Sequence, residues 1–241
     1  MLQLTRSEKF TAHSNILEQM FELRSAQFST RRGWRVSVID GLEKDKFDEL
    51  DPLYLCLIDQ TNKLVASLRI LRTTGPHMLS DVFSEVMGKA AIIRDPLVWE
   101  SSRFCVDTQS VRKYGPEGIN IITLRLLAVL FQVAKEAGIK KIISVFDLYL
   151  ERILRRAGCV FERTGPVVKF DGLKTAGGVF DVNDVIIQNI SRGLASQKVE
   201  GADKSIPLMF PLENITFPSA TNPQIPRVLL LNNNTISNFK V

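Results

Sequence analysis

A short stretch near the middle of the chain, 99–107, carries the side chains best suited to chemistry. Its sequence Trp-Glu-Ser-Ser-Arg-Phe-Cys-Val-Asp is typical of a buried strand, yet it includes Glu100 and Arg103. A carboxylate and a guanidinium in such a segment must be paired, solvated in a cleft or available to a ligand. Side chains alternate along a regular strand, so these two charges are predicted to leave on opposite faces. Either the strand is irregular there, or the two groups reach a ligand from different sides.

Charges lie close to aromatic residues at three further places in the sequence. These places hold Arg24 with Phe28 and Trp34, Asp45 with Asp48, and Arg69. Each has an ordinary explanation when taken alone. An arginine beside an apolar stripe can extend its charged end to solvent, and the mixed acidic segment 41–48 is typical of a solvated loop.

Cysteine and histidine supply little for metal binding or nucleophilic catalysis. Cys56, Cys105 and Cys159 lie far apart in apolar surroundings, a spacing that fits buried structural residues and no zinc or disulfide pattern. No metal site is predicted. Cys105 offers an alternative mechanism through an acyl-enzyme, but neither His13 nor His77 is close in sequence to activate it.

The composition is that of an ordinary globular protein. The chain has 241 residues, of which 45% are hydrophobic and 24% charged. It contains no apolar run long enough to span a membrane, and its first residues do not resemble a secretory signal, so we expect a cytoplasmic protein. The net charge of +5 favours acidic partners. Nucleic acid, an anionic lipid surface, a phosphorylated cofactor and an acidic carrier protein all fit that charge.

The apolar pattern predicts a single α/β domain over residues 1–195, with a mixed central sheet flanked by helices. Helices are expected at 11–30, 116–135, 148–157 and 182–194, with a short one at 79–87. Gly138 and Gly158 are expected to end two of them, and Asp147 to cap a third. Strands are expected at 54–59, 64–72, 99–107 and 141–146, with weaker ones at 167–170 and 179–181. Residues 196–241 form a Pro/Asn-rich extension that packs on the domain or is partly mobile, with 228–231 docking.

Taken together and in order, these motifs resemble the acyl-homoserine lactone synthases, the LuxI-type autoinducer synthases. The resemblance covers about 85 residues. After Val106 the chain resembles the family only in pattern, and its C-terminal extension is longer than usual. The matching residues are Met20-Phe21-Glu22-Leu23-Arg24, Gln27-Phe28, Gly33-Trp34, Asp45, Asp48, Asp51-Pro52, Tyr54-Leu55, Ser67-Leu68-Arg69-Ile70-Leu71, Thr73-Thr74-Gly75-Pro76-His77-Met78-Leu79, Phe83 and Trp99-Glu100-Ser101-Ser102-Arg103-Phe104.

The resemblance implies a fold related to the Gcn5-type N-acyltransferases and a two-part reaction. An acyl group passes from acyl carrier protein or acyl-coenzyme A to the amine of S-adenosylmethionine. The product then closes to an acyl-homoserine lactone, a quorum-sensing signal, and releases 5'-methylthioadenosine. S-adenosylmethionine is a substrate, so no cofactor is implied. Neither nucleic acid nor a membrane is an expected partner.

The resemblance also implies roles for the charged and aromatic residues. Glu100 is the expected base for the amine of S-adenosylmethionine. Arg103 and Arg24 are expected to bind the carboxylate of S-adenosylmethionine. Phe28 and Trp34 offer aromatic faces to the adenine and the sulfonium. The predicted catalytic set also includes Asp45, Asp48 and Arg69. The two carboxylates are expected to pair with basic residues around the N-terminal segment, and Arg69 is expected to serve partly as a structural partner.

The acyl pocket is predicted around the strand at 141–146 and the helices beside it. Ser144 aligns with a family position where a hydroxyl accompanies 3-oxo acyl chains, although a small core residue explains it equally well. Phe146 and Leu148 are expected to limit the acyl tunnel. A basic cluster suits an acidic carrier protein, and a solvated helix face explains the same charges: Lys140, Lys141, Arg152, Arg155 and Arg156.

Two alternative functions are compatible with parts of the pattern. One is an acyl-coenzyme A-dependent N-acyltransferase that acts on another amine and forms no lactone. The other is a basic nucleic-acid-binding module, which would gather basic and aromatic residues on one element. The mixture of acids and bases across several elements disfavours the second.

Overall fold

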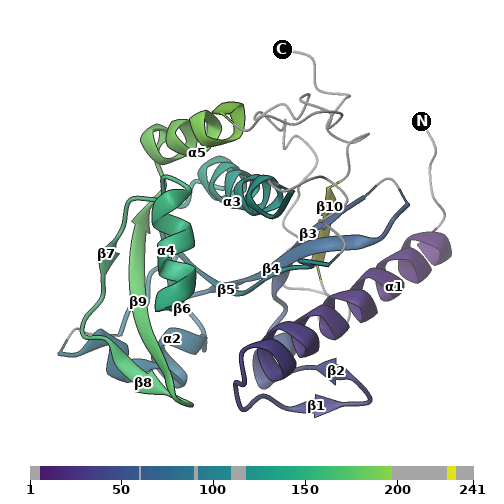
Figure 1. Cartoon of the computed structure of the whole chain (residues 1–241), viewed down its shortest axis with the longest axis horizontal. Helices are drawn as coiled ribbons and strands as arrows, with labels where there is room; N and C mark the ends of the chain where they lie inside the picture. The colour runs from purple at the N-terminus through teal and green to yellow at the C-terminus, as the bar shows by residue number, and fades with distance from the viewer. Residues whose placement is uncertain (1–5, 60, 90–91, 110–117, 197–226, 232–241) are drawn as a thin grey trace.

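A computed structural model describes residues 6–59, 61–89, 92–109, 118–196 and 227–231, which form a central sheet covered by helices (Figure 1). The sheet has eight strands, with the order β10-β3-β4-β5-β6-β9-β7 and β8 paired to β9. Its strands are β3 (Leu53–Ile58), β4 (Leu64–Arg72), β5 (Val98–Val106), β6 (Lys141–Asp147), β7 (Glu162–Arg163), β8 (Val168–Phe170), β9 (Leu173–Asp181) and β10 (Arg227–Leu231).

The sheet is mixed, as the sequence predicts. The predicted hairpin of β3 and β4 is antiparallel, and β4 is antiparallel to β5. In contrast, β5 and β6 run parallel because the long helix α3 (Gly118–Glu136) lies between them in the chain. The prediction of an α/β domain with a partly parallel sheet is therefore confirmed.

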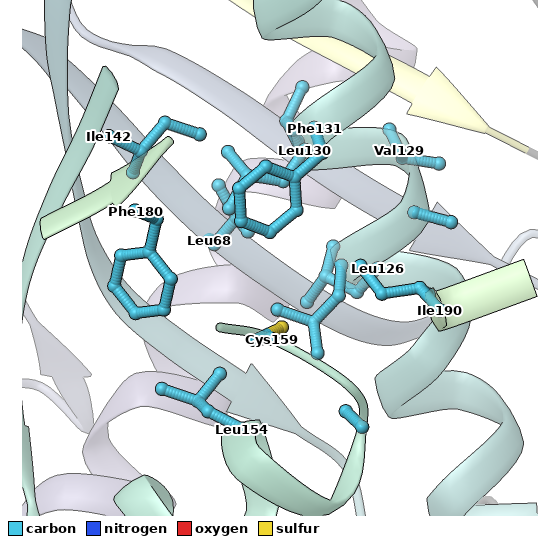
Figure 2. Packing of buried hydrophobic residues seen from close by; sticks show 14 of the residues in the cluster. Leu68, Leu126, Val129, Leu130, Phe131, Ile142, Leu154, Cys159, Phe180 and Ile190 are labelled. Atoms are coloured by element: carbon cyan, nitrogen blue, oxygen red, sulfur yellow. The ribbon is translucent and has the colours of Figure 1, made fainter. Parts of the chain in front are cut away.

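Helices cover both faces of the sheet, and the alternation of side chains along β3 shows this directly. Leu55 and Leu57 pack in the cluster that contains α3, α4 (Leu148–Arg156) and α5 (Asp184–Ser196). Tyr54 and Cys56 point the other way and pack against α1 (Arg6–Ser25). Figure 2 shows the first cluster, in which leucines of α3 meet side chains of β6 and β9.

The predicted helix ends are confirmed where specific residues mark them. Gly138 adopts a φ of 76°, a conformation that favours glycine and ends α3. Asp147 caps α4, and its side chain accepts a hydrogen bond of 2.7 Å from the backbone N–H of Leu150. Two short helices, α2 (Met78–Asp81) and η3 (Ser84–Met87), replace the single helix predicted at 79–87.

The segment predicted as a solvated loop at 41–48 is folded. Asp40 and Gly41 have φ values of 51° and 81°, the conformation of a two-residue turn between antiparallel strands. That turn joins β1 (Val38–Ile39) to β2 (Leu42–Glu43), and the short helix η2 (Lys46–Glu49) follows. Before it, α1 continues into a π-helix, η1 (Ala26–Arg31).

The part of the C-terminal extension that the structure describes is β10. It pairs in parallel with β3, with Val228 opposite Tyr54, so the docking predicted for 228–231 is confirmed for the backbone. The remainder of the predicted extension, 197–226 and 232–241, lies outside the described residues. The division of the chain at residue 195 stays a prediction. Among the described helices, none is long and apolar enough to cross a membrane.

Candidate active site

A cavity of about 370 Å³ opens where β5 and β6 separate. The parallel pairing of these strands ends at Ser101 and Ser144, although β6 continues beside β9 as far as Asp147. Residues 102–104 of β5 and 144–147 of β6 line the cavity, together with parts of the N-terminal segment and of α2. The fold therefore builds a cavity at the point where two neighbouring strands no longer share hydrogen bonds.

Glu100 lies in this cavity with its carboxylate held at the beginning of α2. Its two oxygens accept hydrogen bonds from the backbone N–H groups of Met78, at 2.9 Å, and Leu79, at 2.6 Å. The residue is 1% exposed. Burial raises the pKa of Glu100 to about 7, although the two backbone hydrogen bonds and the charge of Arg69 oppose that rise. A carboxylate with this pKa can accept a proton near neutral pH.

Arg103 lines the same cavity because β5 is irregular at this point. The register against β4 shifts between Ser67, which pairs with Cys105, and Arg69, which pairs with Ser102. One extra residue of β5 therefore lies in this interval, and Arg103 has a φ of 54°, uncommon for a residue with a side chain. The irregular strand, the first of the two alternatives, is correct.

Arg103 belongs to an ion-pair network with five other charged side chains, two of which it contacts directly. Its guanidinium contacts Glu43 at 2.8 Å and Asp45 at 2.7 Å. Glu43 also accepts from Arg24 at 2.5 Å. The full network contains three arginines and three carboxylates: Arg24, Arg69, Arg103, Glu43, Asp45 and Asp48.

Asp48 joins the two arginines of the network that lie deepest. Arg24 donates to both of its oxygens, at 2.8 and 2.9 Å, and Arg69 donates at 2.7 Å. Tyr54 donates its hydroxyl at 2.7 Å. Burial by itself would raise the pKa of Asp48, but the hydrogen bonds and charges of the two arginines hold that pKa well below its usual range.

The network separates residues that the sequence analysis grouped together. Arg24 and Arg69 are fully buried, and neither they nor Asp48 lines the cavity. Arg24 was expected at the substrate carboxylate, but its guanidinium contacts Glu43 and Asp48 instead. The geometry places it behind Arg103, where the charge of Glu43 links the two arginines. Arg69 was expected to serve partly as a structural partner of these carboxylates, and it contacts both Asp45 and Asp48.

Phe28 and Trp34 both line the cavity, as the sequence analysis expects. The guanidinium of Arg103 lies over the Phe28 ring, 5.1 Å from its centroid. Phe28 belongs to the π-helix, a geometry often found at functional sites. Trp34 packs edge-to-face on Phe83, with centroids 5.8 Å apart.

Two contacts hold the segment around Trp34 against the opposite side of the cavity. Arg32 forms an ion pair with Asp147, the residue that caps α4. The backbone N–H of Arg35 donates to the Asp171 carboxylate at 3.1 Å. The N-terminal segment therefore contacts elements more than 100 residues later in the chain, so the cavity has walls from both halves of the sequence.

The predicted acyl-pocket residues divide between the cavity and the core. Ser144 and Phe146 line the cavity, whereas Leu148 does not and packs against the main core cluster. Leu150, two residues further along the first turns of α4, lines the cavity in its place. A smaller inner cavity of about 20 Å³ lies beyond, walled mainly by apolar residues of α3, α4, β6 and β9. Three residues line both cavities: Phe104, Ser144 and Leu150.

The structure gives no support to catalysis by Cys105. The residue is fully buried, does not line the cavity, and burial raises the pKa of its thiol to about 12. His77 is also buried and does not line the cavity. Within the described parts of the chain, no group of three or more potential metal ligands is found.

Glu43 is the network residue that the sequence analysis missed. It is fully buried and contacts two arginines, but its neighbours in sequence are charged and suggested a solvated loop. A signal was available in the dipeptide Asp40-Gly41, which favours a tight hairpin between flanking strands. A hairpin at this dipeptide predicts that Glu43 lies in an ordered strand.

Comparison with known proteins identifies the family. A model described as "Autoinducer synthase" matches residues 7–185. An acyl-homoserine-lactone synthase of Agrobacterium fabrum is 34% identical over 158 residues, which cover 66% of this chain and 75% of that protein. The chain therefore belongs to the autoinducer synthase family, and the resemblance noted in the sequence is confirmed.

Solved structures with the same architecture include two acyl-homoserine lactone synthases. LasI superposes with a TM-score of 0.62 and 29% identity, covering 70% of this chain and 84% of that one. BjaI, described as a coenzyme A-dependent synthase and solved with S-adenosylmethionine and isopentyl-coenzyme A, superposes with a TM-score of 0.67. It is 26% identical, covering 76% of this chain and 84% of that one.

Proposed function

We propose that this protein transfers an acyl group from a thioester to the amine of S-adenosylmethionine and closes the product to an acyl-homoserine lactone. Membership of the autoinducer synthase family supports that activity. The observation that carries the proposal is the joint position of Glu100 and Arg103 in one cavity. A proton acceptor and a carboxylate-binding group then face the same small molecule. Neither alternative function is favoured by a specific observation.

Glu100 is the proposed base for the acyl transfer. The free α-amine has a pKa of about 8, so it carries a proton near neutral pH. Glu100, with a pKa of about 7, takes that proton either directly or through a water molecule. The neutral amine nitrogen then forms a bond to the thioester carbon and the carbon–sulfur bond breaks. The departing sulfur takes the second proton that the nitrogen loses, so the carrier leaves as a thiol.

Arg103 is the proposed anchor for the substrate carboxylate. Its Nη1 contacts the thioether sulfur of Met78 at 3.3 Å, and a thioether is a weak acceptor. An incoming carboxylate is a much stronger partner for that nitrogen. In the second step a carboxylate oxygen attacks the γ-carbon of the same molecule. The bond from that carbon to the sulfonium breaks, and neutral 5'-methylthioadenosine leaves.

The deeper members of the network have a positioning role in this proposal. Asp45 binds both Arg69 and Arg103, and Asp48 binds both Arg24 and Arg69. These contacts fix the guanidinium of Arg103 before the substrate binds, so less ordering remains to be done on binding. The substrate contact expected for Arg24 is replaced here by an indirect role through Glu43.

The acyl donor and the compartment are also proposals. An acyl thioester enters between β5 and β6, carried by acyl carrier protein or coenzyme A. The arginines of α4, including Arg152 and Arg156, are exposed and suit the acidic surface of a carrier protein. All three cysteines are free thiols, as expected for the reducing environment of the cytoplasm. S-adenosylmethionine is used as a substrate, and no cofactor is proposed.

A direct test measures both products in one reaction. The purified protein is incubated with S-adenosylmethionine and an acyl donor, supplied either on carrier protein or on coenzyme A. Mass spectrometry then quantifies the lactone and methylthioadenosine. Equal amounts of the two, both dependent on the donor, are expected. An acylated amine formed without methylthioadenosine would instead support the simple N-acyltransferase.

Trp34→Ala is expected to weaken S-adenosylmethionine binding about fivefold, because a cation–π contact with the sulfonium contributes on the order of 1 kcal/mol. Calorimetry measures the affinity. Trp34→Phe, which keeps an aromatic face, serves as the matched control and should retain most of it. Unchanged affinity in the alanine variant would remove Trp34 from the substrate site.

A further inference from the structure

The proposed base is held by a helix that is too short to be stable alone. Glu100 accepts hydrogen bonds from the backbone N–H groups of Met78 and Leu79, at the beginning of α2. That helix has four residues, and a single helical turn is not stable on its own. Met78 and Leu79 pack in an apolar cluster, but apolar packing is non-directional. The direction of their N–H groups therefore depends on the chain that enters α2.

Arg94 holds that entering chain at three points. Its Nη1 donates to the backbone carbonyl oxygen of Thr73 at 3.2 Å and to that of Gly75, and it lies 2.8 Å from Nδ1 of His77. These three residues belong to the connection between the end of β4 and the beginning of α2. The Thr73 hydroxyl also lies 2.8 Å from the carbonyl oxygen of Asp95, the neighbour of Arg94 in sequence. One nitrogen of Arg94 therefore spans the whole connection from strand to helix.

His77 is a neutral acceptor for this guanidinium. A guanidinium has only donors, so Nδ1 of His77 accepts from Arg94 and the ring carries its proton on Nε2. The Gly75 carbonyl oxygen, 3.2 Å from the same Nδ1, is bound by Arg94 instead. Burial and the charge of Arg94 both lower the pKa of His77, and in the described residues its Nε2 has no hydrogen-bond partner. The ring therefore adds no charge near Glu100 at neutral pH.

Two charged side chains act on the Glu100 carboxyl group. Arg69, on β4, lowers the pKa of Glu100, and Asp81, in α2, raises it. Arg94 also contacts Asp81, at 3.5 Å. Loss of Arg94 would therefore act on Glu100 by two routes, a displaced α2 and an unpaired Asp81. Charged side chains of the other cavity walls, which include Arg103 and Asp147, are unchanged in every variant below.

We propose that Arg94 is a positioning residue for the general base: it fixes the chain between β4 and α2, aims the N–H groups of α2 at Glu100, and thereby stabilises the ionised carboxylate. The inference rests on the proposed function. Hydrogen bonds to an ionised group favour its ionised form, so their loss favours the protonated form. Arg94 does not line the cavity, and its side chain is 40% exposed, so it acts through α2 and not on the substrate.

The test compares the pH profiles of kcat/KM for Arg94→Met and the wild type, measured by methylthioadenosine release. The ionisation of the substrate amine is common to both proteins, so the ratio of their profiles reports the enzyme alone. The pKa of Glu100 should rise from about 7 by about one unit, the order expected when hydrogen bonds to a carboxylate are lost. The variant should then be about tenfold slower near a pH of about 6 and nearly equal near a pH of about 9. No change, or the same loss at every pH, would overturn the proposal.

Three further substitutions separate positioning from charge. Arg94→Lys, whose ammonium can donate to the same acceptors, should keep the wild-type profile. Arg72→Met, which removes an exposed arginine at the end of β4, should also keep it. A shift in either that equals the shift in Arg94→Met would contradict the proposal. Asp81→Asn removes the carboxylate that Arg94 contacts, so adding Arg94→Met to this variant should still raise the pKa of Glu100. If that rise disappears, the unpaired charge of Asp81 is its cause and the positioning role is wrong.

A titration without substrate separates this inference from the proposed function. Carbon-13 NMR of carboxyl-labelled glutamate follows the ionisation of Glu100, whose signal is assigned by its absence in Glu100→Gln. Thermal melting curves check folding, and Arg94→Gln, which is too short to reach all three acceptors, is a second variant expected to shift in the same direction. An unshifted titration in a folded variant would exclude the positioning role. Failure of the wild type to release methylthioadenosine counts against the proposed function instead.

Discussion

Replacing Glu100 with glutamine is expected to lower kcat by about 100-fold or more near pH 8, the range typical for loss of a general base. The affinity for S-adenosylmethionine should change by less than about threefold, because the binding contacts proposed for Arg103, Phe28 and Trp34 remain. Stopped assays of methylthioadenosine release give kcat, and calorimetry gives the affinity.

The same substitution at an exposed position provides the control. Glu85 lies in η3, close to α2 in the chain, and is exposed. Glu85→Gln should keep wild-type turnover, which shows that loss of a carboxylate near α2 is not sufficient. Equal turnover in Glu100→Gln would remove Glu100 as the base. An equal loss of affinity and turnover would give it a binding role instead.

The pH dependence of the reaction tests the same assignment. Glu100 has a pKa of about 7, so at a lower pH its carboxyl group is protonated and cannot accept the proton of the amine. The value of kcat/KM should therefore rise as the pH increases through about 7, and rise again as the free substrate amine loses its proton near a pKa of about 8. In Glu100→Gln the lower step should disappear, and the substrate step should remain.

The sequence was sufficient to predict most of the fold because strong periodic patterns and specific end signals coincide. The apolar repeat of α3 stops at Gly138, and Asp147 caps α4 as predicted. The mixed sheet follows from the order of these elements. The prediction of a solvated loop at 41–48 failed because charge was taken as a sign of solvent exposure, although the charged Glu43 is buried against arginines.

The site was predicted as a set of residue types, but its arrangement required the structure. A one-residue bulge in β5 decides that Arg103 shares a cavity with Glu100, and no pattern in residues 99–107 marks that bulge. Arg24 and Phe28 are adjacent on a helical pattern, yet only Phe28 lines the cavity. The π-helix that changes the register of this segment also leaves no clear sequence signal.

Glu43→Gln is expected to destabilise the protein by about 3–5 kcal/mol, the usual cost of removing one partner of a buried ion pair. Glu43 is fully buried and holds Arg24 at 2.5 Å and Arg103 at 2.8 Å. Glutamine cannot neutralise either guanidinium, so the network would keep one positive charge in excess. Urea unfolding gives the free energy of unfolding for the variant and for the wild type.

Glu49→Gln is the matched control for this substitution. Glu49 is exposed and lies six residues further along the same segment, so the change should alter stability by less than about 0.5 kcal/mol. A loss in Glu43→Gln as small as in this control would show that the network contributes little. Arg24→Met provides the complementary change, because it removes one of the two positive charges that Glu43 neutralises.

The double variant Arg24→Met/Glu43→Gln shows whether charge balance is the cause. Removing both partners leaves two arginines and two carboxylates, so the excess charge of Glu43→Gln is gone. The double variant should therefore lose less stability than the sum of the two single losses, by about 1 kcal/mol or more. Strict additivity would mean that Glu43 acts through packing.

Because Glu43 also holds Arg103, the single variant Glu43→Gln should bind S-adenosylmethionine more weakly than the wild type, whereas the control Glu49→Gln should keep the wild-type affinity. Stability and substrate binding then depend on the same buried carboxylate, since it fixes Arg103, the arginine of the network that lines the cavity.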